Sequence, residues 1–175
     1  MRKLSNNELN RLTPEEFKKT KKIPLIVVLD NIRSQHNIGA VFRTCDAFLI
    51  ECIYLCGITA QPPSAEIHKA ALGAEFTVNW IYHPDTSSLI NELKANGYKT
   101  VAIEQTEGSI MLNKVNLHKN NKYAIVFGNE INGIQQEVVD LCDIHVEIPQ
   151  YGTKHSLNIS VAAGIILWEF FKQLY

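Results

Sequence analysis

The strongest constraint on the fold is the regular alternation of short apolar runs with amphipathic segments. The first run, residues 25–29, is a continuous stretch of branched residues, typical of a strand covered on both faces in a parallel sheet. Similar runs at 52–56, 76–81, 99–103, 123–127 and 144–148 predict five further strands. Helical patterns separate most of them, so the sequence predicts an α/β fold: a mostly parallel six-stranded sheet with flanking helices.

The N-terminal segment, residues 1–22, differs in charge from the remainder of the chain. It carries seven basic and three acidic residues, a net charge of +4, whereas the remainder has −5. Thr13, Pro14 and Glu16 form a capping-box pattern that predicts a short helix ending near Lys21. We therefore expect a basic helical extension, 1–22, and one domain, 23–175. The extension either attracts a polyanion or is a solvated helix, and the sequence favours neither.

The last predicted helix, residues 157–174, is apolar on most of its circumference. Such a helix is buried on more than one side, and in a small chain a second subunit supplies the extra surface. We therefore expect a homodimer.

The chain has no membrane-length apolar run and no secretory signal pattern, so a cytoplasmic protein is expected. Its four cysteines and six histidines lack zinc-ligand spacing, which predicts reduced thiols and no metal.

Three polar loops follow predicted strands, where ligands of open α/β sheets bind. The first carries Asn37 and leads to Arg43. The second, residues 128–134, has two glycines five positions apart around Glu130. The third, residues 148–160, runs into the last helix, which Ser156 or Asn158 is placed to cap. Neither a phosphate-binding P-loop nor a dinucleotide fingerprint is present, which disfavours an ordinary nucleotide-binding protein.

Together the three loops carry a family resemblance. Asn37-x-Gly39-x-x-x-Arg43, Gly128-Asn129-Glu130-x-x-Gly133-Ile134 and Ile148-Pro149…Ser156-Leu157-Asn158-Ile159-Ser160 resemble the ordered motifs of the SpoU/TrmH family, over about residues 24–172. The resemblance implies a C-terminal trefoil knot of the SPOUT class and a homodimer that binds S-adenosylmethionine in the knot. It also implies methyl transfer to a ribose 2′-hydroxyl of tRNA or rRNA, with tRNA slightly favoured. The alternative is a non-catalytic RNA-binding module that retains the fold.

The resemblance also assigns candidate residues. The catalytic candidates are Arg43, Asn37, Glu130, Ser156 and Asn158. The cofactor-binding candidates are Ile103, Glu104, Gln105, Phe127, Gly128, Asn129, Gly133, Ile148, Pro149, Ser156, Leu157 and Asn158. The RNA-binding candidates are Arg43, from the resemblance, and Lys18, Lys19, Lys21 and Lys22, from the basic charge of the N-terminal segment. Outside the motifs, three of the catalytic candidates also have an ordinary interpretation: a surface Arg43, a helix-capping Asn37 and a solvated Glu130.

The chemistry constrains the role of Arg43. The family proposal makes this arginine the general base, but a guanidinium with a pKa above about 12 is a poor base. We therefore expect Arg43 to bind an RNA phosphate and align the hydroxyl, with deprotonation assisted. Positioning and desolvation of the two reactants supply much of the acceleration of such a displacement.

Overall fold

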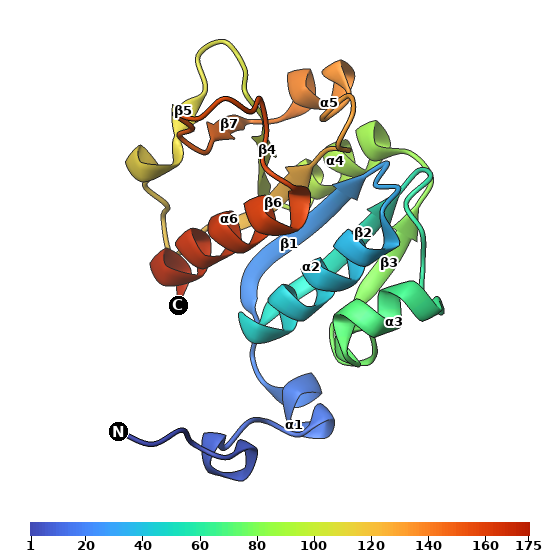
Figure 1. The fold of residues 1–175 in the computed structure, drawn as a ribbon. Helices are drawn as coiled ribbons and strands as arrows, with labels where there is room; N and C mark the ends of the chain where they lie inside the picture. The colour runs from blue at the N-terminus through green and yellow to red at the C-terminus, as the bar shows by residue number, and fades with distance from the viewer.

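Seven strands form one fully parallel sheet in the order β3-β2-β1-β6-β4-β7-β5 in the computed structural model (Figure 1). The structure describes residues 1–175, apart from the side chains of Asn6 and Asn7. The strands are β1 (Ile23–Asp30), β2 (Ile50–Cys56), β3 (Trp80–His83), β4 (Tyr98–Ile103), β5 (Ile110–Met111), β6 (Lys122–Phe127) and β7 (Ile144–Glu147). The α-helices are α1 (Pro14–Lys19), α2 (Gln35–Ala47), α3 (Ala65–Ala71), α4 (Thr86–Ala95), α5 (Gln136–Leu141) and α6 (Ile159–Leu174). Three 3₁₀ segments are η1 (Asn6–Leu9), η2 (Ala74–Phe76) and η3 (Leu112–Lys114).

The α/β class and the parallel sheet are confirmed, but the predicted number of six strands is wrong. The additional strand, β5, is a two-residue edge strand paired only with β7, too short to stand out in the polar segment around it. The predicted strand at 76–81 is also misplaced. Phe76 ends the η2 turn and is 66% exposed, and the amides of Thr77 and Val78 bond back to the carbonyl of Ala74. The β-prone residues there close a turn before β3 begins.

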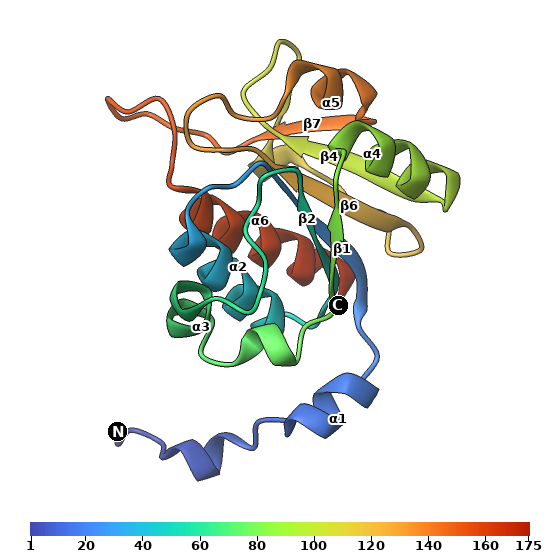
Figure 2. The same cartoon turned by 90° about the vertical axis from the view of Figure 1, so that its right-hand side faces the viewer.

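Helices cover both faces of the sheet, with α2, α3 and α6 on one side and α4 and α5 on the other (Figure 2). The side chains of β1 alternate accordingly: Leu25, Val27 and Leu29 enter the first apolar layer, and Ile26 and Val28 enter the second. Each fully buried side chain of this size stabilises the fold by roughly 1.5–3 kcal/mol. The prediction that β1 is covered on both faces is therefore confirmed.

The strand order brings distant loops together at one edge of the sheet. The chain builds outward from β1 through β2 to β3, then crosses back to β4, and β6 inserts between β1 and β4. The carboxyl ends of β1, β6, β4 and β7 thus lie side by side, which is where open α/β sheets bind ligands. Asp30 ends β1 fully buried, and its carboxylate accepts bonds from the Thr86 hydroxyl at 2.6 Å and the Gln135 amide at 3.3 Å. This carboxylate fixes α4 and α5 to the end of the central strand.

The terminal helices begin at capping residues named from the sequence. Thr13 and Glu16 form the predicted capping box of α1, although this helix ends at Lys19 rather than Lys21. Asn158, one of the two proposed caps of α6, accepts a bond from the Ser160 amide at 2.9 Å. Among the described residues, no helix is both long enough and apolar enough to cross a membrane.

Two phenylalanines provide a matched test of this packing. Phe42 of α2 is fully buried against the sheet, whereas Phe76 is 66% exposed. We expect Phe42→Ala to lower the free energy of unfolding by about 3–5 kcal/mol because it leaves a cavity in the core. Phe76→Ala is expected to change it by less than about 0.5 kcal/mol. Urea unfolding at one protein concentration measures both, and equal losses would contradict this packing.

Candidate functional site

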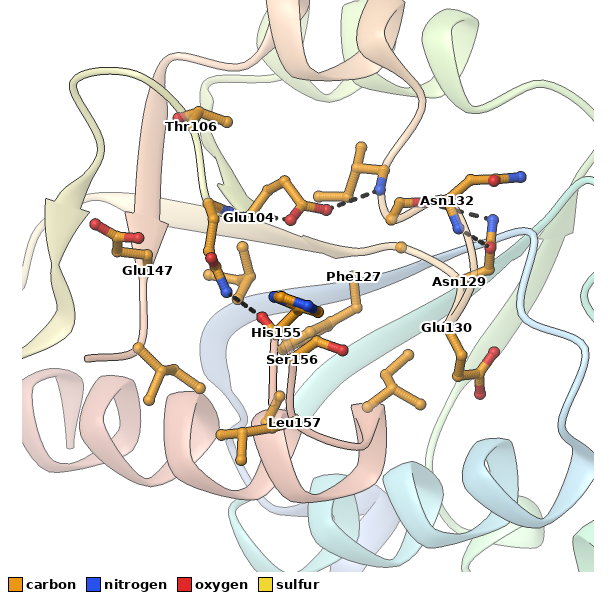
Figure 3. Close-up of a pocket in the computed structure, with 18 of the residues that line it drawn as sticks. Glu104, Thr106, Phe127, Asn129, Glu130, Asn132, Glu147, His155, Ser156 and Leu157 are labelled. Atoms are coloured by element: carbon orange, nitrogen blue, oxygen red, sulfur yellow. Dashed lines mark hydrogen bonds between the residues drawn. The ribbon is translucent and has the colours of Figure 1, made fainter. Parts of the chain in front are cut away.

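A cavity of about 450 Å³ lies at the carboxyl ends of β4, β6 and β7 (Figure 3). Three segments supply most of its lining: residues 103–106 after β4, 127–134 after β6, and 147–157 after β7. Ile159 and Ala162 of α6 close one side, while Gln136 and Val139 of α5 close another. Its volume falls in the range of small-molecule sites.

The loop after β6 is held in one compact conformation. Asn129 and Gly133 exchange two backbone hydrogen bonds of 3.1 and 2.9 Å, and the Asn129 side chain accepts bonds from the amides of Ile131 and Asn132. A Cβ on Gly128 would lie 2.0 Å from the carbonyl carbon of Gly133, and Gly133 itself has φ +66°. Gly128 is therefore required by the close approach of the two ends of this loop, and Gly133 by its positive φ and by the Glu104 carboxylate, which would lie 2.1 Å from a Cβ there.

Glu104 and Gln105, adjacent at the end of β4, bond to the other two loops. The Glu104 carboxylate accepts hydrogen bonds from the amide of Ile134 at 3.1 Å and from that of Gln105 at 3.0 Å. The Gln105 side chain donates to the carbonyl of His155 at 2.7 Å. Glu104 thus holds the loop after β6, and Gln105 holds the loop after β7.

The loop after β7 is open to solvent along most of its length. Residues 151–158 are all exposed, and Ile159 is the first buried residue of α6. Ser156 and Leu157 line the cavity. Asn158 does not line it; its side-chain oxygen caps α6 through the amide and hydroxyl of Ser160.

Asn37 and Glu130 meet although they lie 93 residues apart in the sequence. The Asn37 amide donates to the Glu130 carboxylate at 2.7 Å, and Asn37 is buried while Glu130 lines the cavity. Ser34, rather than Asn37, caps α2. The structure therefore does not use Asn37 as a helix cap but connects the first loop to the rim of the cavity.

The basic candidates lie away from the cavity. Arg43 is exposed on α2 and does not line the cavity of its own chain. Lys18, Lys19 and Lys21 are exposed on the N-terminal segment. Lys22 is partly buried: its ammonium donates to the Phe17 and Thr20 carbonyls and lies 4.0 Å from the centre of the Phe17 ring. Burial lowers the pKa of Lys22.

Most of the cofactor-binding candidates gather in the cavity. Ten of them line it: Ile103, Glu104, Gln105, Phe127, Gly128, Asn129, Gly133, Ile148, Ser156 and Leu157. Pro149 and Asn158 do not. The lining also includes residues that sequence reasoning missed: Thr106, Ile131, Asn132, Ile134, Gln136, Val139, Glu147, Gln150, His155, Ile159 and Ala162. Several of these residues adjoin a named motif residue, and this adjacency was the available signal that they line the cavity. Gln136, Val139 and Ala162 lie in helices and had no such signal.

The lining suits a ligand with both polar and apolar parts. Thr106 exposes no side-chain oxygen to solvent, and this hydroxyl has no hydrogen-bond partner in the described structure. Buried hydroxyls normally have partners, so a ligand group is the expected one. Glu104, Glu130 and Glu147 make the lining acidic, which favours a ligand carrying positive charge. Among the described residues, no group of three or more metal-binding side chains occurs.

The chain resembles known RNA-modifying enzymes over most of its length. The model of the SpoU rRNA Methylase family matches residues 24–168. A tRNA (guanosine(18)-2′-O)-methyltransferase of Aquifex aeolicus is 34% identical over 152 residues, 85% of this chain and 69% of that protein. The 23S rRNA (guanosine-2′-O-)-methyltransferase RlmB of Nitrosomonas europaea is 36% identical over 149 residues, 85% of this chain and 56% of that protein. The chain thus spans between about half and two thirds of the length of these relatives.

Solved structures share the fold. The crystal structure of an AdoMet-bound rRNA methyltransferase from Sinorhizobium meliloti superposes with a TM-score of 0.81 at 28% identity, covering 94% of this chain and 62% of that one. The TrmH/SpoU tRNA-modifying enzyme of A. aeolicus gives a TM-score of 0.79 at 30% identity, covering 91% and 81%.

Two glycines test the loop after β6. In Gly128→Ala the new methyl group would displace the backbone of Gly133, so we expect the unfolding free energy to fall by about 1–3 kcal/mol. Amide hydrogen exchange at Asn129 and Gly133, whose backbone bonds close the loop, is expected to accelerate at least tenfold. Gly152→Ala is the control, because a Cβ there meets nothing within 4 Å. Unchanged exchange in Gly128→Ala would contradict the close approach.

Proposed function

The chain belongs to the SpoU rRNA Methylase family, and from this membership we propose that it is an S-adenosylmethionine-dependent RNA 2′-O-methyltransferase. Its substrate is tRNA or rRNA, with tRNA favoured because the Aquifex relative named above is a tRNA enzyme. The observation that carries the proposal is that two of the three motif loops line one cavity while the first reaches its rim through Asn37 and Glu130.

The residues present fit S-adenosylmethionine. Apolar side chains such as Ile103, Phe127, Ile148 and Leu157 are suited to a purine ring, and the Thr106 hydroxyl to one of its hydrogen-bonding groups. Acidic side chains at the lining favour the positively charged sulfonium and ammonium groups. When bound, this molecule supplies an activated methyl group.

The protein's own task is to position and desolvate the ribose hydroxyl. Glu130 and Asn37 form a fixed polar pair at the rim, and Ser156 adds a hydroxyl on the opposite loop. Arg43 binds the adjacent RNA phosphate, as its fixed charge and forked donors suit that group. Because Arg43 does not line its own cavity, we propose that it acts at the cavity of a second subunit.

The homodimer remains a proposal, supported by α6. Val161, Ile165 and Trp168 are 50%, 38% and 52% exposed and follow helical spacing, so they form one uncovered apolar stripe. Gly164 lies within this stripe, where a Cβ would meet nothing within 4 Å. A second copy packed on the stripe would bury it.

We also propose the trefoil knot and the two-part organisation implied by the resemblance. The knot is supported by β7, which pairs between β4 and β5 and leads directly into the loop that Gln105 holds. A separate extension, 1–22, is supported by the course of this segment away from the sheet (Figures 1 and 2). We assign Lys18, Lys19 and Lys21 to RNA phosphates and Lys22 to the structure of the extension. A cytoplasmic location belongs to this proposal because tRNA and rRNA are the substrates.

Titration with S-adenosylhomocysteine, the product, tests the cofactor site directly. We expect saturable binding in the wild type. Thr106→Val is expected to weaken it about 2–10-fold, the equivalent of one hydrogen bond, while the unfolding free energy stays equal or rises because an unpartnered buried hydroxyl is removed. Thr153→Val, in the exposed loop, is the control and should change neither quantity.

Transfer to RNA is measured with the labelled methyl donor and pools of unmodified tRNA and rRNA. A 2′-O-methylated ribose lacks the hydroxyl needed for alkaline cleavage, so the label should be recovered in alkali-resistant dinucleotides. A folded protein that binds RNA but not S-adenosylhomocysteine would overturn the proposal and favour the non-catalytic RNA-binding module.

The dimer is tested at the centre of the α6 stripe. Ile165→Glu is expected to convert a dimer into a folded monomer, because an unpaired charge buried in an apolar contact costs several kcal/mol. Phe76→Glu, at an exposed apolar residue of η2 outside the α6 stripe, should leave the dimer intact. Sedimentation velocity distinguishes these species, and a monomeric wild type would contradict the proposed dimer.

A further inference from the structure

The proposed reaction requires a proton acceptor that the motif residues do not supply. Resting on the function proposed above, we infer that His155 accepts the proton of the ribose 2′-hydroxyl and that Gln105 is the positioning residue that holds His155 at the cavity. Arginine is unsuited to this role, because its guanidinium stays protonated at all ordinary pH values.

Among the described residues that line the cavity, His155 is the only one with a basic side chain. The other ionisable residues of the lining are Glu104 after β4, Glu130 after β6 and Glu147 of β7. Lys154 adjoins His155 within the loop but does not line the cavity. General bases work best when their pKa is close to the working pH, and imidazole is the side chain whose ordinary pKa is closest to neutrality.

The carboxylates are less suited than His155. Both oxygens of Glu104 already accept hydrogen bonds from backbone amides, so this carboxylate is engaged in holding the loop after β6. Glu130 is bonded to Asn37. The Glu147 side chain forms no hydrogen bond with the described residues, but an ordinary carboxylate is a weak base near neutral pH. The ring of His155 makes no hydrogen bond with the described residues, so its nitrogen lone pair is available.

The backbone of His155 is fixed although its ring is free. Gln105 donates to the His155 carbonyl at 2.7 Å, the only hydrogen bond described between residues 149–157 and another part of the chain. Figure 3 shows the imidazole beside Ser156, on the loop that crosses the cavity. This bond holds the imidazole at the cavity while leaving its nitrogen atoms open to a substrate.

The proton-transfer step balances. The O–H bond of the ribose breaks, and its proton passes to the unprotonated imidazole nitrogen of His155. The oxygen forms the new bond to the methyl carbon as the methyl–sulfur bond breaks and its electron pair stays on sulfur. The imidazolium then releases the proton to solvent, which is accessible because the loop is exposed.

The test compares His155→Ala and His155→Asn with Thr153→Ala, a control in the same exposed loop. With the tRNA pool as substrate, both His155 variants are expected to lose about 10²–10⁴-fold in kcat, the usual contribution of a general base. Added imidazole should restore part of the lost kcat of His155→Ala and should leave the kcat of the wild type unchanged. The kcat of the wild type should fall as the pH is lowered, because a general base must be unprotonated to accept a proton, and His155→Asn should lack this decrease.

A second readout does not depend on turnover. The ring Cε1–H signal of His155, assigned by its loss in His155→Asn, should shift in a ¹H–¹³C NMR spectrum when S-adenosylhomocysteine binds. Gln105→Leu should broaden or move this signal in the free protein and lower kcat less than His155→Ala does. Retained kcat in His155→Asn, or a loss that imidazole does not restore, would overturn the inference. Failure of the wild type to bind S-adenosylhomocysteine would instead refute the proposed function itself.

Discussion

The cavity depends on the side chains of Glu104 and Gln105, the two residues that directly follow β4. The Glu104 carboxylate accepts a hydrogen bond from the amide of Ile134, and the Gln105 side chain donates one to the carbonyl of His155. The loops that follow β6 and β7 are therefore both attached to the end of one strand. β4 lies between β6 and β7 in the sheet, so the residues that follow β4 are next to both loops. A central strand is rigid because both of its edges are hydrogen bonded, and these two side chains connect both loops to that strand.

The sequence predicted the class of fold well because periodicity reports burial. The apolar run of β1 and the amphipathic pattern of α2 follow directly from facing one or two apolar layers. The strand predictions were wrong where burial does not determine the local structure. Phe76 is apolar yet exposed on a turn, and β5 is an edge strand of two residues whose pairing partner lies far along the chain.

The candidate site was predicted mainly through the resemblance, and its geometry was not. The motif spacing named Asn37 and Glu130 separately, but their hydrogen bond depends on a strand order that no local pattern encodes. The role of Asn158 shows the opposite case: its helix-capping geometry follows from sequence chemistry alone. His155 and Thr106 line the cavity but were not named as candidates, and their only signal in the sequence was that each adjoins a named candidate.

The single hydrogen bond between Gln105 and the loop after β7 has a kinetic consequence. Both ends of this loop are anchored, by β7 in the sheet and by Ile159 in the core, while its middle is held at one point. A typical bond of this kind contributes about 0.5–1.5 kcal/mol, only one to a few times the thermal energy. The loop therefore opens transiently, on the nanosecond-to-microsecond scale of loop motions, and Gln105 keeps His155 at the cavity between these openings.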